Sequence, residues 1–99
     1  MAANTQIETI NDISIKFPKK YKVILLNDDY TSMEFVIDIL MGIFHKNYEE
    51  AKAIMLDIHN NGRGICGIYT YEIAQTKVMQ VHRSAKDGGF PLKATMESE

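Results

Sequence analysis

The amino-acid sequence predicts an α+β domain in which a small three-stranded antiparallel sheet has three helices packed on one face, in the order β-α-α-β-α-β. Short apolar runs of strand length begin near residues 21, 65 and 92, and the stretches between them space their apolar residues as amphipathic helices do. With 99 residues, 45% hydrophobic and 24% charged, the chain can form one core but not a deep active-site cleft.

The first elements are an N-terminal tail and a strand. Residues 1–18 are expected to form a flexible tail, because they are polar, their isoleucines are too scattered to form a convincing face, and Pro18 ends them. Residues 19–99 are expected to form one domain. Its first strand is predicted at Tyr21–Leu26, an apolar run typical of a buried strand.

Two helices are predicted next. Thr31 and Glu34 have the spacing of a capping box, so Thr31 is expected to cap a helix that leads to Phe44. Asn47 and Glu50 have the same spacing at the start of the second helix. The expected apolar face of the second helix consists of Ala51, Ile54, Met55 and Ile58, and Gly62 stands where a helix ends.

A strand, a helix and a last strand complete the domain. The second strand is expected at Ile65–Thr70, with Thr70 as the cap of the third helix. The apolar face of that helix is Ile73 or Ala74 with Val78, Val81 and Ala85, and the helix is expected to end at Gly88 and Gly89. Residues Leu92–Met96 alternate in polarity as a half-exposed strand does.

Composition excludes several classes of function. The net charge of −2, with acids and bases mixed along the chain, argues against a nucleic-acid surface. No secretion signal opens the chain and no apolar run approaches 18 residues, so neither export nor a membrane span is expected. The single cysteine, Cys66, cannot form an internal disulfide and suits a reducing compartment. We therefore expect a cytoplasmic monomer.

The run from Asn27 to Glu34 is the most distinctive stretch of the chain. It places Asp28 and Asp29 side by side where a strand passes into a helix. Carboxylates complement the roughly +0.5 charge of a helix start, so taken alone this corner is explained as a turn and a cap. Two full negative charges exceed that need, however, and leave room for a bound cation. His59, at the end of the second helix, is alone best explained as a residue favoured by the helix dipole.

Catalytic and cofactor chemistry finds little support. Cys66 lies inside a predicted strand, whereas a nucleophilic thiol is usually partly exposed in electropositive surroundings. Asp28, Asp29, His59 and His82 lack the close spacing of metal ligands. We therefore predict no enzyme activity, no catalytic residues, no metal and no cofactor.

Four stretches together closely resemble the ClpS family, the bacterial adaptors that deliver substrates to the Clp protease. They are Tyr21–Val36, Met55–His59, Gly64–Gly67, and Glu72 with Lys77. The resemblance covers about residues 20–96. Its most specific part is the run Asn-Asp-Asp-x-Thr-x-Met-Glu-Phe-Val, followed downstream by Met-x3-His. Ser32 departs from the family pattern, in which proline is common, and should loosen the first helical turn slightly.

The resemblance implies an adaptor that binds proteins beginning with Leu, Phe, Tyr or Trp and hands them to the N-terminal domain of a hexameric, ClpA-like Clp ATPase. It assigns the substrate's α-amino group to Asn27, Asp28 and His59, with support from Asp29 and Thr31. It assigns the hydrophobic pocket to Leu25, Met33, Val36, Met55, Ile58 and Leu92. It assigns ATPase docking to Tyr30, Glu72 and Lys77, and gives the tail a role in delivery. Met33 corresponds to the gatekeeper against β-branched first residues.

The alternative hypothesis is a protein-docking module that modulates the ATPase or binds a translation factor without recognising N-termini. The ribosomal stalk protein's C-terminal domain has a similar fold, so the fold alone does not exclude it. The two hypotheses differ in the acidic corner: a docking module does not need the corner and His59 to converge beside a hollow lined by methionine. Because imidazole accepts a hydrogen bond from an ammonium only when neutral, mild acid is expected to weaken the peptide binding of an adaptor.

Overall fold

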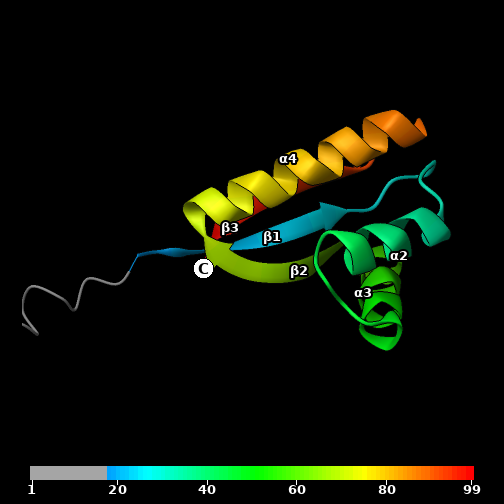
Figure 1. Ribbon diagram of the computed structural model, residues 1–99. Helices are drawn as coiled ribbons and strands as arrows, with labels where there is room; N and C mark the ends of the chain where they lie inside the picture. Colours follow the sequence, from blue (N-terminus) through cyan, green and yellow to red (C-terminus); the bar gives the residue numbers. More distant parts are fainter. Residues whose placement is uncertain (1–17) are drawn as a thin grey trace, which may run out of the picture.

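The computed structural model describes residues 18–99 and confirms the predicted order of elements (Figure 1). The elements are β1 (Lys20–Leu26), α2 (Met33–Gly42), α3 (Tyr48–Asn61), β2 (Arg63–Thr70), α4 (Tyr71–Gly88) and β3 (Lys93–Ser98). The predicted tail, except for Pro18, lies outside the described residues. No helix within residues 18–99 is long and apolar enough to cross a membrane.

The sheet is antiparallel throughout, in the strand order β2-β1-β3. The central strand β1 is the most apolar, and Val23, Ile24 and Leu25 are fully buried. Its register with β2 shifts between Val23 and Ile24, which pair with Gly67 and Ile65 and leave Cys66 without a partner. This bulge bends β2 (Figure 1).

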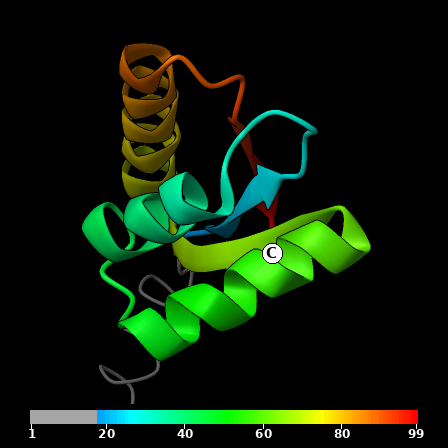
Figure 2. The same ribbon diagram turned by 90° about the vertical axis from the view of Figure 1, so that its right-hand side faces the viewer.

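The helices form a layer on one side of the sheet, as predicted (Figures 1 and 2). Helix α4 packs along all three strands, α3 packs on β2, and α2 rests mainly on α3 (Figure 2). The core between these layers is one cluster of buried apolar side chains. Leu25 of β1, Leu40 of α2 and Val81 of α4 belong to it and have no exposed surface.

The prediction that Thr31 caps the first helix is wrong. Ser32 is the N-cap of α2, because its side-chain oxygen accepts a hydrogen bond from the Phe35 N–H at 3.1 Å. The Thr31 hydroxyl instead donates to Asp28, at 2.7 Å from its Oδ2. This bond orients the Thr31 hydroxyl toward the preceding turn, and the capping bond to α2 comes from Ser32. Ser32, which we expected only to loosen the first turn, therefore stabilises it.

The predicted ends of α3 and α4 are found where the sequence placed them, whereas α2 ends at Gly42, before the predicted Phe44. Asn47 and Glu50 form the reciprocal capping box of α3. Gly62 and Gly89 end α3 and α4 in the left-handed conformation, with φ of 90° and 78°. Thr70 occupies the N-cap position of α4, but its side chain makes no capping hydrogen bond.

Candidate functional site

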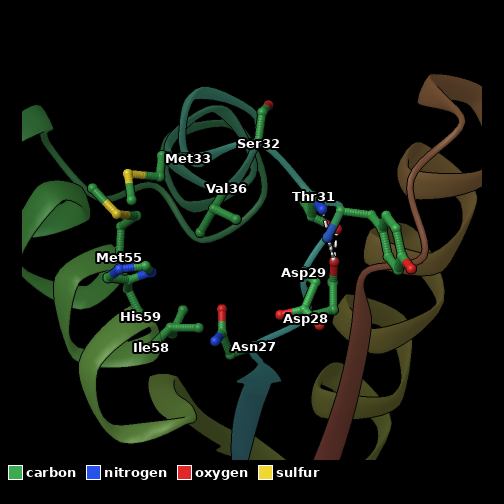
Figure 3. A pocket seen from close by; sticks show the side chains of 11 residues that line it. Asn27, Asp28, Asp29, Thr31, Ser32, Met33, Val36, Met55, Ile58 and His59 are labelled. Carbon is green, nitrogen blue, oxygen red and sulfur yellow. Dashed lines mark hydrogen bonds between the residues drawn. The ribbon is translucent and has the colours of Figure 1, made fainter.

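A hollow of about 440 Å³ opens where the end of β1, the start of α2 and the end of α3 meet (Figure 3). Its size lies within the range of about 300–1,000 Å³ that is typical of small-ligand sites. Its wall consists of Asn27, Asp28, Asp29, Tyr30, Thr31, Ser32, Met33, Val36, Met55, Ile58 and His59. The structure thus brings His59 to the acidic corner, although the two are remote in the sequence.

The backbone fixes the position of Asn27 relative to His59. The Asn27 N–H donates to the Gly62 carbonyl at 2.9 Å, and the Gly62 N–H donates to the Ile58 carbonyl at 2.9 Å. The end of β1 is therefore tied to the C-terminal turn of α3, which carries His59. Figure 3 shows the Asn27 side chain rising from β1 between Ile58 of α3 and the Asp28–Asp29 turn.

Asp28 organises the turn that follows Asn27. Its Oδ1 accepts hydrogen bonds from the backbone N–H groups of Tyr30 at 2.8 Å and Thr31 at 2.7 Å, while its Oδ2 accepts from the Thr31 hydroxyl. Burial of the carboxyl raises its pKa, but these three bonds together favour the charged form more strongly, so the pKa of Asp28 lies below its ordinary value. Asp28 is thus an anion that is already largely engaged.

Unused acceptors remain on the polar side of the hollow. A carboxylate has about four acceptor positions, so Asp28 retains one. Among residues 18–99, the side chains of Asn27, Asp29 and His59 find no hydrogen-bond partner, and all three residues are exposed. An amide oxygen, a free carboxylate and an imidazole therefore stand around one space that can receive a cation with several N–H donors.

The opposite side of the hollow is apolar. Met55 and Ile58 of α3 are buried, with 7% and 3% of their surfaces exposed, and Val36 of α2 is buried beside them. Met33, the first residue of α2, is 47% exposed and lies with Met55 at the edge of the hollow in Figure 3. A flexible methionine at the rim over a fixed apolar wall suits a bulky side chain.

The hollow does not include every residue assigned to it. Leu25 and Leu92 are buried in the core cluster and are not part of its wall. Val36, Met55 and Ile58 belong to the same core cluster and do line the hollow. The assignment of Leu25 and Leu92 to the hydrophobic pocket stays a prediction. Sequence reasoning missed Ser32 as a member of the wall. Its strong preference as an N-cap was the available signal.

The predicted docking residues are spread over two elements. Tyr30 lies in the turn beside the hollow and is 79% exposed. Glu72 is exposed in the first turn of α4. The Lys77 ammonium, also on α4, donates to the Ile43 carbonyl at 2.7 Å and so ties α4 to the end of α2.

The surroundings of Cys66 do not suit a nucleophilic thiol. Cys66 is 1% exposed, and burial raises the pKa of its thiol to about 12. Its Sγ lies 3.9 Å from the Gly64 carbonyl oxygen. Such a thiol is protonated and shielded at neutral pH, which suits a packing residue.

Comparisons with known proteins agree on one family. The family described as "ATP-dependent Clp protease adaptor protein ClpS" matches residues 16–95. The Clp protease adapter protein ClpS of Wolinella succinogenes is 52% identical over 92 residues, which cover 93% of this chain and 90% of that protein. The adapter of Acetivibrio thermocellus is 48% identical over 99 residues and covers both chains fully. The structure of Agrobacterium tumefaciens ClpS2 bound to L-phenylalaninamide matches with a TM-score of 0.81 and 38% identity, over 84% of this chain and 100% of that one.

Proposed function

The chain belongs to the ClpS family of adaptors of the ATP-dependent Clp protease, and we propose that it binds proteins beginning with Leu, Phe, Tyr or Trp and delivers them to a hexameric Clp ATPase. As a protease adaptor it is not an enzyme. The observation that carries the proposal is the meeting of free hydrogen-bond acceptors and an apolar wall in one hollow.

The polar side suits a free α-amino group. That group has a pKa of about 7.7–8.0, so near pH 7 it is mostly an ammonium with three N–H donors. Three acceptors can bind it: the Asn27 amide oxygen, the remaining position on Asp28 and an imidazole nitrogen of His59. Asp29 adds negative charge beside them, while Thr31 holds the Asp28 carboxylate in place.

The apolar side suits the first side chain of the substrate. Met33, Val36, Met55 and Ile58 form its wall, and Leu25 and Leu92 support it from the core. L-phenylalaninamide, the molecule bound to the Agrobacterium relative, carries a free α-amino group and a benzyl side chain. These are the two features for which the two sides of this hollow are suited.

Magnitudes explain why both features are needed. Each charge-assisted hydrogen bond contributes roughly 1.5–3 kcal/mol, and burial of one large apolar side chain contributes about the same. Association costs roughly 4 kcal/mol or more before any contact is counted. Neither the ammonium nor the side chain alone overcomes that cost comfortably, so the pair sets the specificity.

The test compares a Leu-first peptide with its N-acetylated twin and with a Gly-first peptide, by calorimetric or fluorescence titration. Acetylation removes the ammonium and at least two charge-assisted bonds, about 3 kcal/mol or more, so affinity should fall at least roughly 100-fold. The Gly-first peptide keeps the ammonium, loses the apolar contact and should also bind weakly. Equal affinity of the Leu-first peptide and its acetylated twin would contradict the proposal.

Delivery requires a second surface. We assign it to Tyr30, Glu72 and Lys77, which would contact the N-terminal domain of a ClpA-like ATPase. A module that only docks would not need free acceptors gathered at a methionine-lined hollow, so the geometry favours an adaptor that recognises N-termini over the docking alternative. A cytoplasmic, monomeric state completes the proposal.

A further inference from the structure

A second hollow, here called the basic hollow, lies between the end of α2 and the middle of α4. Its volume is about 330 Å³, and it shares no residue with the hollow that carries Asn27 and His59. Its wall consists of Gly42, Ile43 and His45 beside α2 and of Lys77, Gln80, Arg83 and Ser84 on α4. Two permanent cations, Lys77 and Arg83, thus line one space, and none of the residues in the wall is acidic.

The charge of the basic hollow is not balanced within the described part of the chain. The one ion pair among residues 18–99 joins Arg63 to Glu97, at the sheet. Asp38 lies one turn before Gly42 on α2, but it neither lines the basic hollow nor pairs with a cation. The chain as a whole carries a net charge of −2, so this concentration of positive charge runs against its average composition.

The two cations are held differently. Lys77 is half-buried, and its ammonium donates to the Ile43 carbonyl at 2.7 Å, which leaves two of its three N–H donors. Its charge offsets the roughly −0.5 charge at the end of α2. Arg83 is exposed, and its guanidinium has no hydrogen-bond partner among residues 18–99. The charge of Arg83 is therefore in excess, and its planar N–H groups match the two oxygens of a carboxylate.

His45 adds a side chain that the fold itself does not need. It is the only residue other than glycine with a positive φ, 57°, within residues 18–99. Glycine adopts this conformation more easily, so the turn after α2 does not depend on the imidazole. The side chain is exposed, lines the basic hollow and makes no hydrogen bond in the described part of the chain. It is thus free to contact a partner.

We propose that the basic hollow receives an acidic side chain of the Clp ATPase, with Arg83 and His45 as contacts beside Lys77. The inference rests on the proposed function, because it requires an ATPase that docks on the chain. Continuity selects this partner: Lys77 belongs both to the basic hollow and to the docking surface proposed above. The N-terminus of a substrate does not suit the basic hollow, because its ammonium would be repelled by the two cations.

The test titrates the full chain and its variants against a hexameric ClpA-like ATPase at about 0.15 M salt. Arg83→Glu should weaken binding at least about tenfold, because it places like charges against each other. Arg83→Gln should weaken it less, since the repulsion is absent. Lys52→Glu makes the same change of charge at an exposed lysine of α3 outside the basic hollow, and binding should change less than about twofold. Equal losses for Arg83→Glu and Lys52→Glu, or tighter binding by Arg83→Glu than by Arg83→Gln, would overturn the proposal.

A second variant removes a contact without straining the backbone. His45→Gly suits the φ of 57° and should still weaken ATPase binding about threefold, the effect of one lost hydrogen bond. Titration with a Leu-first peptide should give unchanged affinity for His45→Gly and Arg83→Glu, and a parallel loss there would assign the effect to a disturbed fold and overturn the proposal.

Failure of this inference is distinguishable from failure of the proposed function. If Glu72→Gln weakened ATPase binding and Arg83→Glu did not, the basic hollow would lie outside the docking surface, and only the present inference would fall. If the unaltered chain did not bind the ATPase at all, the proposed delivery would fall, and the inference with it.

Discussion

Gly62 links the two halves of the candidate site, and replacing it tests that link. Gly62 has φ of 90°, and a Cβ added there would meet no atom within 4 Å. The cost of Gly62→Ala is therefore conformational: a left-handed backbone costs an ordinary residue about 1–2 kcal/mol. A gain of about 0.4–1 kcal/mol from the less flexible unfolded chain offsets part of it, which leaves a net loss of about 1 kcal/mol.

Gly42 provides the matched control. It also has open space around its Cβ position, but it is the last residue of α2 and has no positive φ, so Gly42→Ala should stabilise the protein by about 0.4–1 kcal/mol through the less flexible unfolded chain. Urea titration measures both changes. With a slope of about 1–3 kcal/mol/M, the midpoint should fall by roughly 0.3–1 M for the first variant and rise for the second. If both variants shifted the urea midpoint in the same direction, the positive φ of Gly62 would not be the cause of its loss of stability.

Gly62→Ala should also weaken the binding of Leu-first peptides, because the Gly62 carbonyl holds the Asn27 N–H beside the turn that carries His59. Unchanged peptide affinity in a destabilised Gly62→Ala protein would show that this hydrogen bond does not position the site.

Three further predictions concern the corner itself. Ser32→Ala should cost about 1 kcal/mol of stability by urea titration, as the loss of an N-cap does; no change would return the cap to Thr31. Because the folded-state pKa of Asp28 is lowered, its carboxylate stabilises the protein above the unfolded pKa of about 3.9, and this stability is lost as pH falls through the lower folded value. In Asp28→Asn, the free energy of unfolding should therefore fall less steeply as the pH is lowered through this range. An unchanged pH dependence would contradict the assignment. Met33→Ala should admit Ile-first and Val-first peptides in a titration, and the absence of any such gain would remove Met33 from the gate.

Sequence alone predicted the fold because each element has a local signal. Alternation or apolar runs marked the strands, and the left-handed glycines and the Asn47–Glu50 box marked most helix ends. The failure at Thr31 has a physical cause. Two neighbouring hydroxyl residues, Thr31 and Ser32, each qualify as the cap; Asp28, three residues before Thr31, orients the Thr31 hydroxyl toward the turn, and Ser32 accepts the helix N–H instead. The spacing of residues in the sequence does not show which of two neighbouring hydroxyl residues caps the helix.

The candidate site was predictable only as pieces. Asn27 and His59 are remote in the sequence, and nothing local places them together. Their approach depends on the hydrogen bond between the Asn27 N–H and the Gly62 carbonyl, hence on the turn between α3 and β2. The sequence also could not show that Leu25 and Leu92 lie in the core and not in the wall of the hollow. Alternation indicates which side of a strand is apolar but not whether a side chain reaches a cavity wall.

The hydrogen bonds of Asp28 change how the two functional hypotheses are best separated. Removing its carboxylate frees the Tyr30 N–H as well as the Thr31 groups, and Tyr30 is the residue assigned to ATPase docking. A loss of both peptide and ATPase binding on Asp28→Ala would then follow from one disordered turn and would not show that the two surfaces coincide. Asn27 and His59 have no side-chain hydrogen bond to that turn within residues 18–99. They are therefore the positions at which the recognition of N-termini is separable from docking.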